Sequence, residues 1–512
     1  MALSFALLPI VWLFISLGYF RLAAHQACTL GLFLSIAICV SFLQMPYNLA
    51  FEAALEGAIL AFVPILWVIF AAFYTYNICV KSGAMTRIKN IMANLSGDRR
   101  IQVLAIAWGF GGFFESVAGF GTAVAIPASI LVALGFEPFF AAIVCLLANT
   151  VAVAFGVVGI PITMLAKITG LPVLPLSLAA AAQLTPFVIL VPFLLVFTVT
   201  KSLAGFRGVW LTTLLAGLSF AGAQYITAKY VGPELPAIIG SVFSLATIIA
   251  CVKLMPGSQT WRFPGEDGRQ YEAAAAGGRE PLSSQCKIWA PYLLLLFFAL
   301  VTSRLSPPLN GLLSQAKTTF VVYSGTGGAP LSIDWLLTPG TLIMLAAILG
   351  GLIQGCSCRT LATTLGETLS QLQTTALTVI SIVSMSKVLA YSGTIGFIAM
   401  ALSDTSGLFY PAIAPLIGML GTFITGSDTS ANILFGLLQK NVALQIGTDP
   451  IWIAAANTSG ACIGKLISPQ NIAIAAVATG LTGKEGDILN IMIKYAGIFT
   501  VGLGVITYVF AT

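Results

Sequence analysis

FFESVAGFGTA, residues 113–123, and FITGSDTSAN, residues 423–432, are the two stretches that decide how this chain folds. Each places one acid, Glu115 or Asp428, among small and hydroxyl-bearing residues inside long apolar sequence. A carboxylate at the centre of a bilayer costs roughly 2.5 to 3.5 kcal/mol on insertion scales, so it requires a partner or a water-filled cavity. The two stretches therefore predict a transport pathway.

The rest of the chain has the composition of a membrane protein. Of its 512 residues, 58% are hydrophobic and only 8% are charged, and the mean hydropathy is +1.00. Soluble domains carry about 25% charged residues. The apolar runs are long enough to cross roughly 30 Å of hydrocarbon and too long for barrel strands of about 10 residues. We therefore predict an all-α polytopic protein with one membrane domain over residues 1–512.

Twelve crossing helices and two re-entrant hairpins are expected. The crossings lie near 3–20, 27–43, 58–80, 138–166, 176–200, 208–228, 236–253, 288–303, 338–355, 374–391, 450–482 and 488–511. The hairpins, 101–136 and 409–438, each carry an acidic stretch at mid-length. Basic residues concentrate in 81–100 and in the linker loop 254–287, which the positive-inside rule places in the cytoplasm.

The chain also repeats itself. Ser82-Gly83 recurs 310 residues later as Ser392-Gly393, and Ala148–Thr150 recurs as Ala456–Thr458. Seven predicted crossings separate the first pair, so the copies should face opposite sides of the bilayer. Inverted-topology repeats are typical of secondary transporters, whose site lies near the midplane where broken helices meet.

Each repeat contains a broken helix as well as a hairpin. Repeat 1 is assigned to 58–200, with its broken span over 138–166, and repeat 2 to 374–511, with its broken span over 450–482. Both spans combine Asn-Thr with glycine and proline, which weaken or remove helical hydrogen bonds. The N-termini of half-helices attract anions, so a small anion is the expected cargo.

Two lysines inside apolar sequence are candidates for the site. Lys465 lies within the second broken span, where its ammonium would hold a substrate carboxylate or, alternatively, neutralise Asp428 or Glu115. Lys387 lies near one end of the span 374–391 and is a further candidate, although it could equally extend to the membrane interface.

Both acids are candidates for carrying a coupling proton. Burial disfavours the charged form of a carboxyl, and Glu115 is the first choice because it precedes its hairpin tip. Asp428 follows Gly-Ser and suits a hairpin cap that accepts backbone N–H bonds. The two roles could be exchanged. His25, the only histidine, is expected at the membrane edge.

The other candidates are small polar residues and glycines of the tips and breaks. Besides Lys465, the predicted substrate-binding residues are Asn149, Thr150, Asn457, Thr458, Ser427, Thr429, Gly119 and Gly121. The alternative for the Asn-Thr pairs is that they satisfy the backbone of the broken helices. No metal or cofactor is expected, because the nine cysteines are scattered and Cys356-x-Cys358 lacks metal-ligand spacing.

At these residues the chain resembles the L-lactate permease family, over essentially its whole length. The resemblance is strongest in FITGSDTSANILFGLLQ (423–439) and AANTSGACIGKLISPQNIAIAAVATGL (455–481), with AGFGTAVAI (118–126) and NTVAVAFGVVGIP (149–161) in support. It implies symport of protons with lactate, glycolate or a related 2-hydroxymonocarboxylate across the bacterial inner membrane. The chain departs from the family at Ser116-Val117, where Gly-Ala is common, and this bulkier tip is expected to change the shape of the pocket.

Other functions fit less well. A sodium-coupled organic anion carrier with a similar architecture is the main alternative. A channel is disfavoured because paired inverted repeats favour alternating access. An intramembrane enzyme is disfavoured because Gly426-Ser427-Asp428 offers only part of an aspartyl protease motif. The expected partners are a small carboxylate, protons and the lipid bilayer, with a homodimer left open and no nucleic acid.

Overall fold

The computed structural model describes residues 2–16, 20, 22–93, 95–119, 121–254, 260–263, 282–302, 307–326, 328, 330–481 and 484–511. Within these residues the chain is almost entirely helical, as predicted, and it is an integral multi-pass membrane protein. The linker loop expected over 254–287 lies mostly outside the described residues, as does Phe120 in the first acidic stretch.

The first half of the chain forms helices over most of its apolar runs. These are α1 (Ala2–Phe14), α2 (Ala24–Ser41), α3 (Tyr47–Leu60), the π-helical η2 (Ala61–Leu66), α4 (Trp67–Lys81), α5 (Ala84–Ala93), α6 (Arg99–Val103), the π-helical η3 (Leu104–Phe110), α7 (Gly111–Val117), α8 (Thr122–Ala133), α9 (Pro138–Asn149), η4 (Val153–Phe155), α10 (Gly156–Thr169), α11 (Val173–Thr200), η5 (Leu203–Phe206), α12 (Trp210–Tyr230) and α13 (Pro236–Leu254). Proline at the first position of α9 suits a helix start, where its missing N–H is not needed.

The second half adds a short β-hairpin, which is the one departure from an all-α fold among the described residues. Its elements are α15 (Leu282–Ile288), α16 (Ala290–Thr302), α17 (Pro307–Leu313), β1 (Lys317–Phe320), β2 (Leu331–Asp334), α18 (Pro339–Ile353), α19 (Cys358–Gln371), α20 (Gln373–Tyr391), α21 (Thr394–Ser406), η6 (Gly407–Phe409), α22 (Tyr410–Thr425), α23 (Asp428–Ile446), α24 (Pro450–Gly464), α25 (Pro469–Thr479) and α26 (Glu485–Val509). The strands are antiparallel, with Lys317 opposite Asp334.

Seven helical runs in the described chain are long and apolar enough to cross a membrane, and an eighth counts α9 and α10 as one span bent by 63°. Four apolar helices are shorter, namely most of α2 and all of α8, α16 and α18. The expected total of twelve crossings therefore stays a prediction. The region predicted as a broken span, 138–166, contains this bent pair of helices, and whether the pair crosses the membrane as one span stays a prediction.

One predicted boundary is wrong. The span expected over 58–80 is a helical run of 35 residues, Tyr47–Lys81, which begins earlier because Glu52 and Glu56 belong to it. The run is interrupted at Val63, whose backbone is extended (φ −130°, ψ 114°). The next residue in the sequence is a proline, which disfavours the helical conformation at the residue before it.

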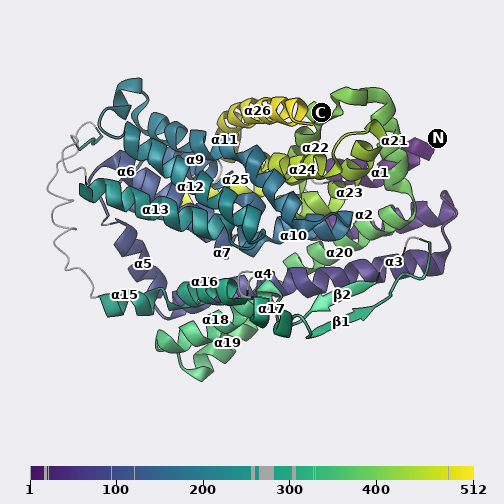
Figure 1. Cartoon of the computed structure of the whole chain (residues 1–512), viewed down its shortest axis with the longest axis horizontal. Coiled ribbons are helices and arrows are strands. Elements are labelled where there is room, and N and C mark those ends of the chain that lie inside the picture. The colour runs from purple at the N-terminus through teal and green to yellow at the C-terminus, as the bar shows by residue number, and fades with distance from the viewer. Residues whose placement is uncertain are drawn as a thin grey trace.

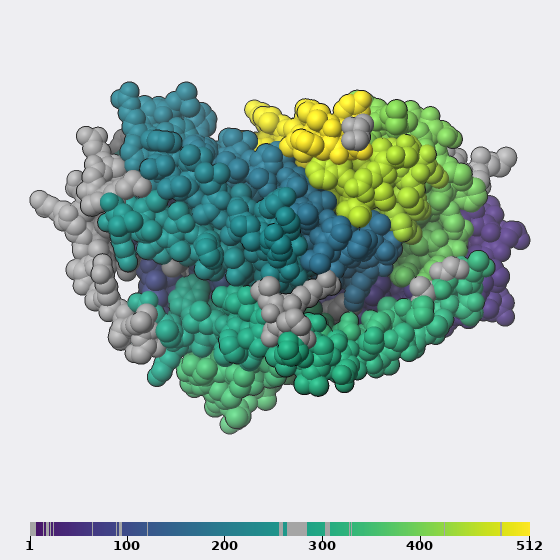
Figure 2. Space-filling view, in the orientation of Figure 1, coloured from purple at the N-terminus to yellow at the C-terminus, as the bar shows by residue number. Residues whose placement is uncertain are grey.

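The helices are arranged in two layers (Figure 1). The site layer comprises α6–α13 and α22–α26, and the support layer comprises α2–α4 and α16–α20 with the β-hairpin. Within the support layer α20 packs on α2 and α3, and α18 packs on α4 and α16. The layers meet where α20 contacts α23 and where α10 contacts α4. Figure 2 shows β1 and β2 on the outer surface of the support layer.

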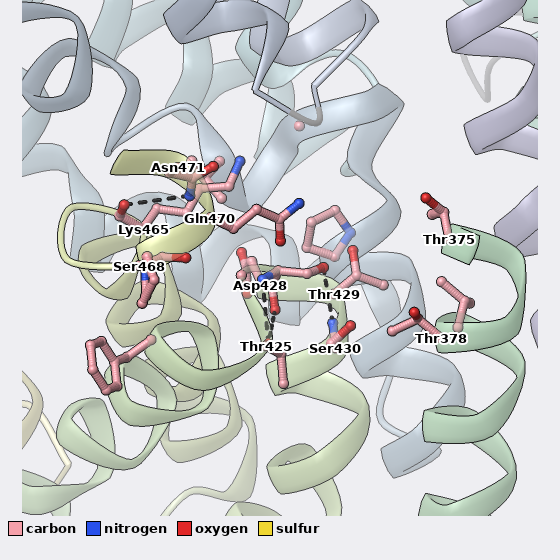
Figure 3. Close-up of a pocket in the computed structure, with 18 of the residues that line it drawn as sticks. Thr375, Thr378, Thr425, Asp428, Thr429, Ser430, Lys465, Ser468, Gln470 and Asn471 are labelled. Carbon is pink, nitrogen blue, oxygen red and sulfur yellow. Dashed lines mark hydrogen bonds between the residues drawn. The ribbon is translucent and has the colours of Figure 1, made fainter. Parts of the chain in front are cut away.

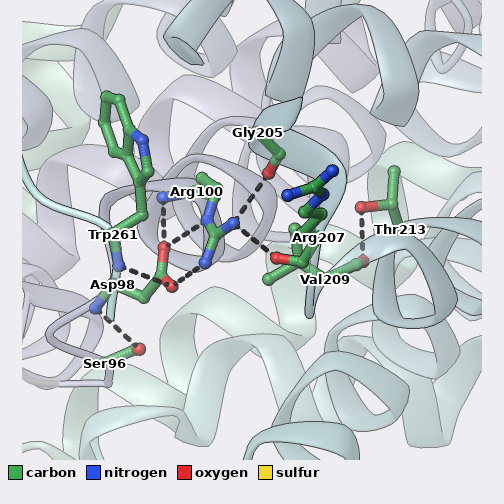
Figure 4. A network of polar contacts seen from close by, with 8 residues as sticks. All are labelled: Ser96, Asp98, Arg100, Gly205, Arg207, Val209, Thr213 and Trp261. Atoms are coloured by element: carbon green, nitrogen blue, oxygen red, sulfur yellow. Dashed lines mark hydrogen bonds and ion pairs between the residues drawn. The ribbon is translucent and has the colours of Figure 1, made fainter. Parts of the chain in front are cut away.

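A buried ionic network joins three chain segments at one end of the molecule (Figure 4). The Arg100 guanidinium pairs with the Asp98 carboxylate at 2.7 Å and donates to the carbonyl oxygens of Gly205 and Arg207. The same carboxylate accepts the backbone N–H of Trp261. The network therefore gathers the start of α6, the loop after α11 and the described part of the linker.

The two ends of the molecule differ in charge and structure. We call the end that carries the Arg100 network and the Lys81–Glu367 ion pair the basic end. The opposite, strand end carries the β-hairpin, where Ser324 donates its N–H and hydroxyl to Glu52. In Figure 1, α5 and α6 lie to the left at the basic end, and β1 and β2 lie to the right.

The same order of elements occurs twice in the chain. The first series is α4, α5, α6–α7, α8, α9, α10 and α11, and the second is α20, α21, α22, α23, α24, α25 and α26. The second half of each broken helix packs against the other series, because α10 contacts α23 and α25 contacts α8. The two turns and the two breaks therefore come together inside the site layer.

Candidate functional site

The first turn, between α7 and α8, is built on two glycines. Gly119 and Gly121 adopt positive φ angles of 54° and 86°, which residues with a Cβ rarely adopt. A Cβ on Gly119 would also collide with Val157 in α10, and one on Gly121 would collide with Ile474 in α25. The glycines thus allow the turn to contact both broken helices.

The second turn, between α22 and α23, is capped by a residue other than the one expected. Ser427 is the N-cap of α23 and accepts a hydrogen bond from the Ser430 N–H, so the prediction that Asp428 acts as the cap is wrong. Asp428 instead occupies the first turn of the helix, where a negative charge is favourable. Its carboxylate oxygens both lie 3.0 Å from the Thr458 hydroxyl, which donates to them.

The first break distorts the backbone at the start of α10. Val157 and Val158 have positive φ angles of 43° and 55°, followed by Gly159 at 73°. The left-handed region is unfavourable for β-branched residues, so this backbone is strained. Gly156 lies against the first acid, because a Cβ there would be 2.9 Å from the Glu115 Oε1.

The second break places a lysine opposite that acid. α24 ends at Gly464, and α25 begins at Pro469 after Ser468. Between them, the Lys465 Nζ lies 2.7 Å from the Glu115 Oε1, with 9% and 3% of the two side chains exposed. The other oxygen of Glu115 has no hydrogen-bond partner among the described residues. This ion pair joins the two series of helices.

A cavity of about 950 Å³ opens beside this ion pair, between the two layers. The site layer contributes charged and hydroxyl side chains, and the support layer faces them with His25 and a row of threonines. The polar lining includes His25, Glu115, Thr374, Thr375, Thr378, Thr425, Ser427, Asp428, Thr429, Ser430, Lys465, Ser468, Gln470, Asn471 and Glu485. Figure 3 shows Thr375 and Thr378 on a separate helix across from Asp428 and Thr429.

The structure brings some of the predicted site residues together and sets others apart. Five of them line the cavity, namely Glu115, Ser427, Asp428, Thr429 and Lys465. Gly119 and Gly121 do not line the cavity, and they allow the turn to pack against Val157 and Ile474.

The Asn-Thr pairs do not line the cavity. Thr458 donates a hydrogen bond to Asp428, which does line it. The amide of Asn457 is used by the protein, since it donates to the Asn432 Oδ1 at 2.9 Å and accepts from Gln439 at 3.1 Å. The Thr150 hydroxyl donates to a carbonyl of its own helix. The Asn149 Oδ1 has no hydrogen-bond partner among the described residues. These contacts favour the structural alternative for Asn457 and Thr150.

Lys387 lies away from the cavity and has a partner that the sequence analysis missed. Its Nζ lies 2.8 Å from the Glu56 Oε1 of α3, and it stacks over the Tyr391 ring. The signal for Glu56 was an acid inside an apolar run. His25, which the sequence predicts at the membrane edge, lines the cavity, and its position relative to the membrane stays a prediction. Its place next to the start of α2 left both positions open.

A polytopic helical protein with an ion pair and a cavity where two broken helices meet has the features of a membrane transport protein. Comparison with known sequences agrees. The sequence model of the L-lactate permease family matches residues 3–512. The chain belongs to the L-lactate permease family.

Several curated relatives cover nearly the whole chain. An L-lactate permease of Streptococcus iniae is 45% identical over 457 residues, 89% of this chain and 94% of the relative. An L-lactate permease of Bacillus subtilis strain 168 and a glycolate permease of Escherichia coli K12 are each 36% identical, over 98% of this chain and 94% of the relative.

Comparison with solved structures matches two transporters at low similarity. The Alcanivorax borkumensis YdaH transporter is 14% identical and has a TM-score of 0.49, covering 89% of this chain and 86% of its own. Neisseria gonorrhoeae MtrF is 15% identical with a TM-score of 0.45, covering 89% and 83%.

Proposed function

We propose that the protein is a proton-coupled symporter of L-lactate or a related 2-hydroxymonocarboxylate, such as glycolate, in the bacterial inner membrane. The family and its curated relatives support a transporter of lactate or glycolate. The observation that carries the proposal is the buried Lys465–Glu115 ion pair on the wall of the cavity. It offers one cation for a carboxylate and one acid for a proton.

The domain organisation that we propose is two inverted repeats, over 58–200 and 374–511, with hairpins 101–136 and 409–438. The repeated order of elements supports it, as does the reciprocal packing of α10 on α23 and of α25 on α8. Such an arrangement lets one bundle move against the other around a fixed site. The support layer would then provide the stationary wall that carries Thr375 and Thr378.

The mechanism follows from the charges at the ion pair. A proton on Glu115 neutralises the carboxylate and leaves the Lys465 ammonium without its counterion. A substrate carboxylate then takes the place of Glu115 on the ammonium. The net charge of the site is the same before and after proton and anion have both bound, so the loaded site avoids the cost of an uncompensated buried charge.

Hydroxyl groups around the cavity suit a 2-hydroxy acid. Thr429 lies next to Asp428 on the site layer, and Thr375 and Thr378 face them from the support layer. Each hydroxyl can donate and accept a hydrogen bond, as can the 2-hydroxyl of lactate or glycolate. In this proposal Asp428 stays bound to Thr458 and orients the substrate hydroxyl.

The proposal is tested with purified protein in liposomes. Uptake of labelled L-lactate should follow an imposed pH gradient, acidic outside, and should be inhibited by unlabelled lactate and glycolate more than by succinate. Uptake that requires a sodium gradient and ignores the pH gradient would contradict proton coupling and favour the sodium-coupled alternative. Saturable counterflow separates a carrier from a channel.

A further inference from the structure

A second cavity, of about 300 Å³, lies between the two layers and is separate from the cavity described above. Its lining includes Val63, Val158, Thr163, Lys167, Glu234 and Asp334. Three of the six carry charge. Charged side chains in a membrane protein generally face water or the interior of the bundle, so this cavity has the lining of an aqueous space.

The two cavities lie toward opposite ends of the molecule. Lys167 is two residues from the end of α10, and Asp334 is the last residue of β2 in the hairpin of the strand end. The central cavity instead reaches Thr374 and Thr375 in the first turn of α20, directly after α19, whose Glu367 pairs with Lys81 at the basic end. The second cavity therefore opens toward the strand end.

The wall between the cavities is thin. Ile160 and Pro161 line the central cavity, whereas Val158 and Thr163 of the same helix line the second one. The first turn of α10 thus has one cavity on each side. Similarly, Val63 lines the second cavity and Ile65 the central one, two residues further along the same run.

Both parts of this wall have an irregular backbone. Val63 is extended inside η2, and Val157 to Gly159 have positive φ angles. Irregular backbone at membrane depth is tolerated where it is buried in protein or lines a water-filled cavity. One irregular segment belongs to the support layer and the other to the site layer, so relative motion of the layers would open this wall.

Lys167 is the cation of the second cavity. It is exposed, and it lines the cavity together with Asp334, which belongs to the other layer. Glu234 enters from the loop between α12 and α13. A carboxylate ligand would pair with the Lys167 ammonium in this cavity, as it would pair with Lys465 in the central cavity.

We propose that the second cavity is the strand-end vestibule of the transport route, and that Lys167 binds the carboxylate of the substrate there before the substrate passes the α10 wall. The carboxylate class rests on the proposed function above. The vestibule itself rests on the cavity, its charges and the two irregular segments, and can be tested without any substrate.

The test uses thiol labelling of the full chain in membrane vesicles of known orientation. Thr163→Cys reports on the vestibule, because residue 163 lies one turn from Lys167 on the same face of α10. Thr375→Cys reports on the central cavity. Both are made in a background with Cys286, Cys356 and Cys358 changed to Ser, since these are the described cysteines that are not buried. The probes are membrane-impermeant methanethiosulfonates, one anionic and one cationic.

We expect Thr163→Cys to react from the strand end and Thr375→Cys from the basic end. Adding Lys167→Gln should lower the anionic-to-cationic rate ratio at residue 163 by about tenfold, because one nearby unit charge changes each rate by roughly threefold in water. Lys229→Gln, which removes a charge near the same end but outside the cavity, should leave the ratio unchanged.

The proposal falls if Thr163→Cys does not react from the strand end while Thr375→Cys reacts from the basic end. The role of Lys167 falls if Lys167→Gln and Lys229→Gln give the same ratio. Lactate uptake by the unlabelled protein is measured in parallel. If both cysteines are labelled as expected but the protein takes up neither lactate nor glycolate, the proposed substrate is rejected and the vestibule is retained. If the protein takes up lactate but Thr163→Cys does not react, the vestibule alone is rejected.

Discussion

Two lysine–glutamate pairs of nearly identical length, each with a buried glutamate, have different surroundings. Lys465 and Glu115 lie 2.7 Å apart on the wall of the central cavity. Lys387 and Glu56 lie 2.8 Å apart between α20 and α3, and neither lines one of the two cavities described. The second pair has additional support from Tyr391, whose hydroxyl donates to the Glu56 Oε1 at 2.7 Å.

A buried charge alone therefore does not identify a transport site. The Glu56 pair is closed off by protein, because the Tyr391 ring also stacks on Tyr323 of the β-hairpin segment at 3.8 Å. The Glu115 pair instead borders a cavity that can hold a substrate. Both glutamates have one carboxylate oxygen without a hydrogen-bond partner among the described residues, so it is the cavity that distinguishes the two pairs. We therefore expect the first pair to contribute to stability and the second to transport.

The largest effect is expected for the closed pair. Lys387→Met leaves the Glu56 carboxylate buried without its cation, which typically costs roughly 3 to 5 kcal/mol in folding free energy. Unfolding of the protein in lipid nanodiscs should show this loss, while lactate uptake per folded molecule is retained. The double variant Glu56→Gln, Lys387→Met should recover much of the stability. A stable Lys387→Met variant without uptake would place this pair in the transport route.

At the cavity pair the expected loss is in transport. Lys465→Met removes the ammonium that is proposed to bind the substrate carboxylate. We therefore expect lactate uptake to fall at least about 100-fold, which corresponds to roughly 2.7 kcal/mol in activation free energy at 1.36 kcal/mol per tenfold. Stability should fall less than for Lys387→Met, because water in the cavity can solvate Glu115. The matched control is Lys253→Met, on an exposed position at the end of α13. Normal substrate affinity in a folded Lys465→Met protein would show that Lys465 does not bind the substrate carboxylate.

Glu115→Gln separates proton coupling from substrate binding. The amide resembles the protonated acid, so uptake driven by a pH gradient should fall about 100-fold, while lactate counterflow, which needs no net proton movement, falls less than about tenfold. Asp428→Asn is the comparison, measured in the same liposomes. If Asp428→Asn shows this pattern and Glu115→Gln does not, the coupling proton is carried by Asp428 and not by Glu115.

The smallest effect is expected at the hydrogen bond that supports the closed pair. Tyr391→Phe removes one donor to the Glu56 carboxylate and should lower the free energy of unfolding by about 1.5 to 3 kcal/mol, the range for hydrogen bonds to charged groups. Uptake per folded protein should not change. A similar stability in Tyr391→Phe and the parent protein would show that Lys387 alone satisfies Glu56.

Much of the fold could be predicted from the sequence because apolar length, glycine and proline are local signals. The bend between α9 and α10 falls where Asn149, Gly156 and Pro161 predict it. The start of α3 was missed because its helix includes two acids. Only the tertiary structure shows that one of them, Glu56, has a lysine partner far along the chain.

The site was predicted less completely for a related reason. Lys465, Glu115 and Asp428 stand out as charges in apolar sequence, and all three line the cavity. Thr375 and Thr378 carry no such signal, because a threonine on an apolar helix usually bonds to its own backbone. Their place opposite Asp428 depends on how α20 packs against α23, which is a contact between distant segments.

The left-handed valines at the start of α10 have a thermodynamic consequence. Holding a residue other than glycine in this conformation costs roughly 1 to 2 kcal/mol, so Val157 and Val158 together raise the energy of this form by a few kcal/mol. A second form in which they rejoin the right-handed helix would recover that energy. The strain would thus narrow the free-energy difference between this form and such a second form, so that the binding free energy of a small substrate would be enough to shift the balance between them.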